Sequence, residues 1–164
     1  MQTETTKLRE LTIRYAVRRD TAGRHVLIGR TLNSPKDAAA AFLATLQDEP
    51  SEVFAMLCLT TKHRVIAYHE VSRGTLDATL VHPREVFRPA LREAAAAVVL
   101  VHNHPSGDPT PSREDQEITE RLAAAGELLG IPVLDHVVVA ERGYVSLRES
   151  DLLRTGTGLA GGTG

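Results

Sequence analysis

The chain has 164 residues, 42% of them hydrophobic, which suffices for one hydrophobic core and fits a single domain. Its 19 basic and 21 acidic residues give a net charge of −2, so no basic excess indicates binding to nucleic-acid phosphates. The polar first residues lack the apolar core of a signal peptide, and no apolar run approaches membrane-spanning length. We therefore expect a cytoplasmic protein that has no membrane partner.

The first half of the chain alternates between strand and helix patterns. A helix is expected to begin at Ser34-Pro35, with Ser34 as its cap and Pro35 at its first position, and to run to about Gln47. The predicted strands before residue 82 cover 11–17, 24–28, 52–60, 63–71 and a short segment at 78–81. The first two strands would form one hairpin, and the next two would form another around a two-residue connection, Thr61-Lys62.

The second half continues the alternation. Residues 83–97 have a helical apolar stripe, in which Pro89 predicts a kink or a second helix start. The apolar run 97–102 predicts a buried strand. The most regular helix pattern covers 112–129 and ends at Gly130. Residues 131–140 and 144–147 are expected to complete the sheet.

This order of elements predicts an α/β fold in layers, with a central mixed β-sheet flanked by helices. Residues 1–50, a β-hairpin and a helix, are expected to belong to the same globular unit as the main domain, 51–153. The last residues, 154–164, form a tail rich in glycine and threonine. Cys58, the single cysteine, excludes an internal disulfide and is interpreted as a buried core residue because it lies in an apolar strand.

The stretch HNHPSGDPTPSRED, residues 102–115, follows the buried strand and leads into the long helix. His102 and His104 are two residues apart, so in an extended chain their imidazoles project to the same side and suit one metal ion. Asp115 is the first carboxylate that the helix start could bring back to them, and Asp108 competes with it. Two nitrogen ligands and one oxygen ligand with an open fourth position are typical of catalytic zinc. Iron and manganese are alternatives.

Ser112 and Asp115 also have a purely structural interpretation. The spacing Ser-x-x-Asp before an apolar-periodic segment is a helix capping box, in which each side chain bonds the other residue's backbone N–H. Taken alone, this pattern needs no metal. A capped helix does not, however, require two histidines in front of it, so the combination favours a metal site.

The pattern of His102-x-His104, seven residues, Ser112, two residues and Asp115 resembles the signature of the JAMM metalloprotease superfamily, whose members share the JAB/MPN (MPN+) domain. The surrounding HNHPSGDPTPS is similar to the RadC branch of that superfamily. Further similarity lies in EVFAMLCLT, RGTLDATLVHPREVF, LGIPVLDHVVV and YVSL, so the resemblance covers about residues 50–150.

The resemblance implies a layered, cytidine-deaminase-like JAB/MPN fold and hydrolysis of a peptide or isopeptide bond in an unidentified protein or peptide substrate. It implies that His102, His104 and Asp115 hold Zn²⁺ with water as the fourth ligand. Glu52 would act as general base, with Glu70 as the reserve candidate, and Ser112 would steady the developing oxyanion.

An alternative function follows from the same resemblance. RadC-like proteins carry a DNA-repair label, so the chain could be a binding factor for DNA or a DNA-repair partner in which the metal site is secondary. Longer RadC-like proteins resemble a helix-hairpin-helix module joined to the catalytic domain. The first fifty residues here do not show the pattern of that module, which weakens the inference about DNA.

His136 is interpreted as a supporting or structural residue rather than a ligand. The sequence LAGG at 159–162 is interpreted as filler rather than as a substrate-like tail.

Overall fold

The computed structural model of the protein describes residues 27–45, 49–74 and 81–153. These residues form three helices and five strands. Their bounds are α1 Pro35–Thr45, β1 Val53–Leu59, β2 Val65–Arg73, α2 Pro83–Arg92, β3 Ala97–Asn103, α3 Arg113–Leu129, β4 Val133–Ala140 and β5 Gly143–Ser146.

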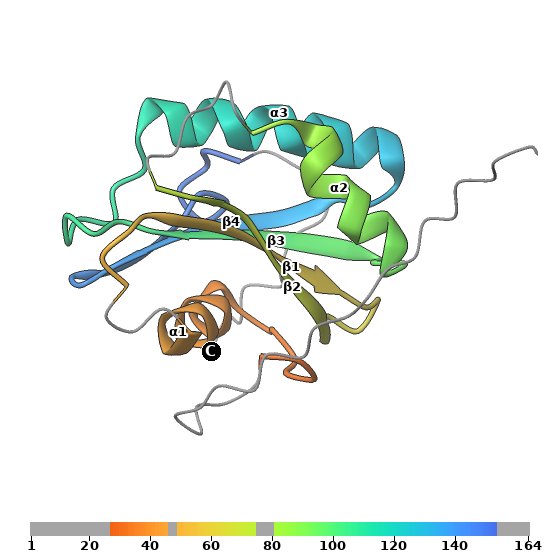
Figure 1. The fold of residues 1–164 in the computed structure, drawn as a ribbon, viewed down its shortest axis with the longest axis horizontal. Helices are drawn as coiled ribbons and strands as arrows, with labels where there is room; N and C mark the ends of the chain where they lie inside the picture. Colours follow the sequence, from red (N-terminus) through yellow and green to blue (C-terminus); the bar gives the residue numbers. More distant parts are fainter. Residues whose placement is uncertain (1–26, 46–48, 75–80, 154–164) are drawn as a thin grey trace, which may run out of the picture.

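The five strands form one mixed sheet in the order β2-β1-β3-β4-β5. Strand β1 is antiparallel to both β2 and β3, β3 is parallel to β4, and β5 returns antiparallel to β4. Helix α3 makes the crossover that a parallel pair requires between β3 and β4. Figure 1 shows α2 and α3 on one side of the sheet and α1 on the other. The predicted α/β fold with a mixed sheet flanked by helices is therefore confirmed.

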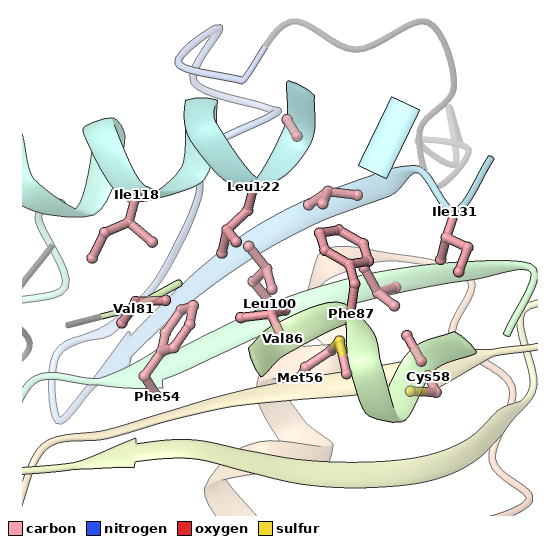
Figure 2. Close-up of a cluster of buried hydrophobic side chains, with 14 of the residues drawn as sticks. Phe54, Met56, Cys58, Val81, Val86, Phe87, Leu100, Ile118, Leu122 and Ile131 are labelled. Carbon is pink, nitrogen blue, oxygen red and sulfur yellow. The ribbon is translucent and has the colours of Figure 1, made fainter. Parts of the chain in front are cut away.

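Both faces of the sheet are covered, and β1 shows this residue by residue. All seven of its side chains are buried, and they alternate between two hydrophobic clusters. Val53, Ala55, Leu57 and Leu59 face the cluster that includes residues of α1, whereas Phe54, Met56 and Cys58 face the cluster beneath α2 and α3. Figure 2 shows the second cluster, where Phe87, Ile118 and Leu122 come down from the helices. Burial on both faces explains why β1 is a continuous apolar run.

The helix starts follow the predicted capping chemistry. At α1, the Ser34 Oγ accepts a hydrogen bond from the Asp37 N–H at 3.3 Å, and the Asp37 carboxylate accepts one from the Ser34 N–H at 3.0 Å. Helix α3 begins after Ser112 with the same arrangement and ends at Gly130, which adopts a φ of +69°. A positive φ is accessible to glycine without a Cβ clash. The predicted helix over 112–129 is confirmed.

Two predicted elements differ in detail. The helix that starts at Pro83 is shorter than expected: it continues through Pro89 but ends at Arg92, and Ala94 then adopts a φ of +50°. The second hairpin does not turn on two residues. The backbone N–H of His63 donates to the Thr60 carbonyl at 2.9 Å, and His63 adopts a φ of +53°. The loop therefore has three residues. A two-residue hairpin turn needs positive φ at positions that threonine and lysine disfavour.

Several predictions fall outside the described residues. These are the strand at 11–17, most of the strand at 24–28, the end of the first helix at 46–47, most of the strand at 78–81 and the tail at 154–164. Leu27 and Ile28, the described end of the second predicted strand, lie in a bend and a turn. Among the helices within the described ranges, none combines the length and the apolar character needed to cross a lipid bilayer.

Candidate metal centre

The candidate site lies where the start of β1, the end of β3 and the start of α3 meet. Phe54 of β1 is opposite His102 of β3, so Glu52, two residues earlier, lies beside the end of β3. His102 is on the face of the sheet that α3 covers, and His104 follows directly after the strand. Asp115 is in the first turn of α3. Three separate segments therefore supply the site.

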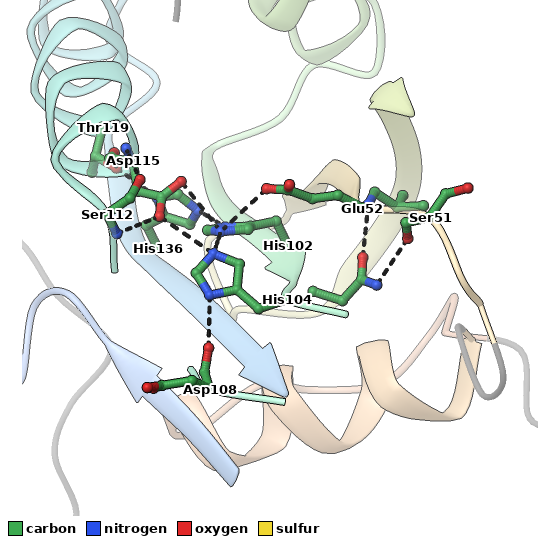
Figure 3. Close-up of polar contacts among 11 residues, drawn as sticks. Ser51, Glu52, His102, His104, Asp108, Ser112, Asp115, Thr119 and His136 are labelled. Carbon is green, nitrogen blue, oxygen red and sulfur yellow. Dashed lines mark hydrogen bonds and ion pairs between the residues drawn. The ribbon is translucent and has the colours of Figure 1, made fainter. Parts of the chain in front are cut away.

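The predicted ligands converge, as Figure 3 shows. The two histidine Nε2 atoms, of His102 and His104, are 2.8 Å apart. Asp115 places Oδ1 3.3 Å from the His102 Nε2 and Oδ2 3.4 Å from the His104 Nε2. Glu52 is slightly farther away, with its Oε1 4.0 Å from the His102 Nε2. One donor atom from each of these four residues lies within 4.8 Å of the other three, and this group could hold a metal ion.

The capping box orients the carboxylate of Asp115 toward the candidate metal site. Its Oδ2 accepts a hydrogen bond from the Ser112 N–H at 2.6 Å, and the Asp115 N–H donates to the Ser112 Oγ at 3.1 Å. Burial would raise the pKa of Asp115, but the adjacent imidazoles of His102 and His104 hold this pKa well below its ordinary value. The carboxylate is thus ionised, buried and fixed in direction.

His104 is oriented by the loop that follows it. Its Nδ1 lies 2.8 Å from the Asp108 carbonyl oxygen. Since a carbonyl can only accept, Nδ1 carries the proton and Nε2 is left to face the other ligands. Hydrogen bonding to Asp115 raises the pKa of His104, against the opposing effect of burial. The ionised carboxylate therefore favours a positive charge at this position, either a proton on the imidazole or a metal ion.

His136 of β4 lies behind His102 and is outside the group of four. Its Nε2 is 2.8 Å from the His102 Nδ1, and its Nδ1 is 2.5 Å from the Thr119 Oγ1. Complete burial lowers the pKa of His136 well below its ordinary value, so its ring is neutral at neutral pH. Sequence analysis missed Thr119, because its contact with β4 depends on how α3 packs.

Asn103 also went unnoticed in the sequence. Its side-chain Oδ1 accepts a hydrogen bond from the Val53 N–H at 2.7 Å, and its Nδ2 donates to the Ser51 carbonyl at 3.0 Å. These two backbone groups flank Glu52. Strand alternation offers a signal for this role, because a residue between two histidines that face one side must face the other.

The reserve candidates are not brought to the site. The Asp108 carboxylate is exposed and accepts hydrogen bonds from the backbone and the hydroxyl of Thr110 at 2.9 and 2.7 Å. Only the backbone carbonyl of Asp108 contacts a histidine of the group. Glu70 forms two hydrogen bonds with Arg73, at 2.9 and 2.8 Å.

A mixed five-stranded sheet between helices, with this histidine and aspartate arrangement at the strand and helix ends, defines the class of JAB/MPN domains. Comparison with protein families makes the assignment specific: residues 32–152 match the family model of the RadC-like JAB domain. The chain belongs to this family.

Curated relatives agree with the family. A UPF0758 protein of Methanosarcina barkeri is 47% identical over 125 residues, which cover 76% of this chain and 55% of the relative. One from Trichlorobacter lovleyi is 53% identical over 120 residues, covering 73% of this chain and 52% of the relative. One from Symbiobacterium thermophilum is 61% identical over 102 residues, covering 62% and 44%. The chain spans about half the length of the curated relatives it matches, and their names give no enzymatic activity.

Proposed function

We propose that this protein is a zinc-dependent hydrolase that cleaves a peptide or isopeptide bond in a protein or peptide substrate. The observation that carries the proposal is the convergence of two imidazoles and two carboxylates from three segments of the chain, all within 4.8 Å. Three of these groups are suited to hold a metal ion. The fourth, Glu52, is farther from the His102 Nε2 than Asp115 is, at 4.0 Å, and we assign it the role of base rather than ligand.

The donor set fits zinc in number, type and spacing. Ligand bonds of about 2.0–2.1 Å in a tetrahedral site put the ligand atoms roughly 3.3 Å apart. Each histidine Nε2 lies at about that spacing from one carboxylate oxygen of Asp115, 3.3 Å from Oδ1 for His102 and 3.4 Å from Oδ2 for His104, whereas the two Nε2 atoms are closer together, at 2.8 Å. Three protein ligands leave one position for water or substrate, as in catalytic rather than structural zinc sites.

The chain's own residues supply the remaining chemistry. A bound zinc ion would act as a Lewis acid, lowering the pKa of water and polarising the scissile carbonyl. Glu52 is then the general base: its carboxylate accepts a proton from the attacking water and delivers it to the leaving amine. Its side chain is 23% exposed, so it can be reached from solvent, and Asn103 holds the backbone on both sides of it.

Ser112 is proposed to stabilise the negative charge that develops on the carbonyl oxygen. Its Oγ accepts a hydrogen bond from the Asp115 N–H, and an accepted bond leaves the hydroxyl proton available for donation. A donor aimed at a developing oxyanion contributes about 10²–10³-fold to turnover. Because Ser112 also caps α3, its replacement by alanine should lower both turnover and the free energy of unfolding, the latter by about 1 kcal/mol.

Binding to DNA would require basic side chains directed at phosphates. Arg73 at the end of β2 instead bonds Glu49 and Glu70. The chain as a whole has a net charge of −2. We therefore prefer hydrolysis, and the two functions separate in solution: DNA binding weakens steeply with salt, whereas zinc-dependent hydrolysis stops when a chelator is added.

The test is a screen of zinc-loaded protein against a library of peptides and isopeptide-linked peptides, followed by variants on the best substrate. E52Q should keep its zinc and lose about 10²–10⁴-fold in turnover, because a carboxamide cannot take the proton. E120Q, a matched change at an exposed position of α3, should retain wild-type turnover. Full activity of zinc-loaded E52Q would show that Glu52 is not the base.

A further inference from the structure

A continuous line of hydrogen bonds runs from the backbone of one proposed metal ligand to the imidazole of another. The Thr119 Oγ1 lies 2.5 Å from the Asp115 carbonyl oxygen and 2.5 Å from the His136 Nδ1. The His136 Nε2 lies 2.8 Å from the His102 Nδ1. All four residues are buried, with Asp115 2% exposed and the others fully covered.

The proton positions along this line follow from the group at its end, the Asp115 carbonyl, which can only accept a hydrogen bond. Two oxygens 2.5 Å apart must share a hydrogen bond, and a carbonyl oxygen has no proton to give. The single hydroxyl proton of Thr119 therefore points at the Asp115 carbonyl. Thr119 can then only accept from the imidazole beside it, so the His136 Nδ1 carries the proton of that ring.

The next group along the line is the imidazole of His102. His136 is fully buried, and its two ring nitrogens contact a hydroxyl and an imidazole rather than a carboxylate, so the ring is neutral. With its proton on Nδ1, His136 presents a lone pair on Nε2, and this lone pair faces the His102 Nδ1. We propose that Thr119 and His136 are positioning residues that set the tautomer of His102, placing its proton on Nδ1 and its free lone pair on Nε2, where the metal ion binds. In the opposite tautomer, the His102 Nε2 would carry a proton and could not be a ligand.

The arrangement links the ligands to each other as well as orienting them. Thr119 lies one turn after Asp115 on α3, whereas His102 and His136 lie on the neighbouring strands β3 and β4. The line therefore ties the ligand on the helix to the ligand on the sheet. His104 is oriented differently, by a backbone carbonyl of its own loop. Loss of Thr119 should consequently affect His102 and leave the orientation of His104 unchanged.

The first test measures the tautomers directly. In ¹⁵N-labelled metal-free protein, long-range proton–nitrogen spectra distinguish protonated from unprotonated ring nitrogens, and H136Q identifies the signals of His136. We expect protons on Nδ1 of both His136 and His102. A proton on the His136 Nε2 would overturn the proposal, and this result would be independent of any catalytic activity.

The second test measures zinc affinity by competition with a chelator, and this part depends on the proposed metal function. T119V removes the hydroxyl, whereas T119S keeps it. Loss of a group that orients a ligand costs about 10–100-fold in metal affinity, so T119V should bind zinc at least about tenfold more weakly, and T119S should match the wild type.

The outcomes separate the two proposals. Equal zinc affinity of T119V and the wild type would overturn the positioning role. If the wild type itself bound no zinc, the metal function would fail, and the ring-nitrogen spectra would still decide the tautomer. Should T119V not fold, the spectra of the wild type decide the proposal alone.

Discussion

Replacing Asn103 by alanine should destabilise the protein and impair Glu52 at the same time. Asn103 is 9% exposed, and its side-chain amide bonds the Val53 N–H and the Ser51 carbonyl, at 2.7 and 3.0 Å. N103A leaves both backbone groups without this partner. Val53 is fully buried, so its N–H cannot turn to solvent, whereas Ser51 is half-buried and its carbonyl can partly recover water.

The loss of stability in N103A can be worked out from the Val53 N–H and the Ser51 carbonyl. A buried polar group left unpaired costs about 1–3 kcal/mol, so N103A should lower the free energy of unfolding by about 2–4 kcal/mol. For a chain of this length, that loss corresponds to a fall of about 5–15 °C in the thermal midpoint. Thermal and urea unfolding measure it. N33A is the matched control, because Asn33 is the other asparagine of the chain and is exposed.

The functional part of this prediction concerns Glu52 alone. The three proposed metal ligands do not depend on the Asn103 amide, so N103A should bind zinc as the wild type does while its turnover falls. An unfolding midpoint of N103A equal to that of N33A would refute the structural reasoning. Loss of zinc from folded N103A would show that Asn103 supports the ligands rather than the base.

Three further predictions concern the core and the sheet. G126A should be less stable than the wild type by about 1–3 kcal/mol, because an added Cβ would lie 2.5 Å from the Ile131 carbonyl oxygen and overpacking outweighs the better helix propensity of alanine. The Cys58 thiol, whose pKa burial raises to about 12, should react with a thiol reagent only as fast as the protein unfolds. Burial and the charge of Arg88 lower the pKa of His69, so its NMR titration midpoint should lie below 6.5, and R88Q should raise it.

A specific result would contradict each of the predictions for Gly126, Cys58 and His69. A wild-type urea midpoint for G126A would mean that helix α3 shifts to accommodate the methyl group. Rapid labelling of Cys58 in the folded protein would contradict its burial. Because the lowered pKa disfavours protonated His69 in the folded state, the free energy of unfolding should decrease as the pH falls below about 6.5. The free energy of unfolding of H69Q should decrease less over the same pH range. Equal acid sensitivity of H69Q and the wild type would contradict this account.

Local chemistry made much of the fold predictable. The capping boxes at Ser34 and Ser112, and the helix end at Gly130, depend on residues within one helical turn, so the sequence displays them directly. The two central strands, β1 and β3, are apolar runs that are too short for most helices. The hairpin after β1 was predicted with the wrong loop because His63 takes a positive φ that its residue type does not announce.

The site was only partly predictable for a related reason. His102 and His104 share a side by strand alternation, and Asp115 is brought back by the helix start, so local geometry indicates the ligands. The contact of Asn103 with residues 51–53 and the contact of His136 with Thr119 join segments far apart in the chain. Such contacts depend on strand order and helix packing, which no local pattern specifies.

The most direct test of the central claim is the metal content of protein purified without chelator, measured by elemental analysis for the wild type and for H102A/H104A. The control is H69A/H82A, which removes two histidines outside the site. The account predicts about one zinc ion per chain in the wild type and in the control, and none in H102A/H104A. No zinc in the wild type after zinc is added back, or equal zinc in H102A/H104A, would contradict it.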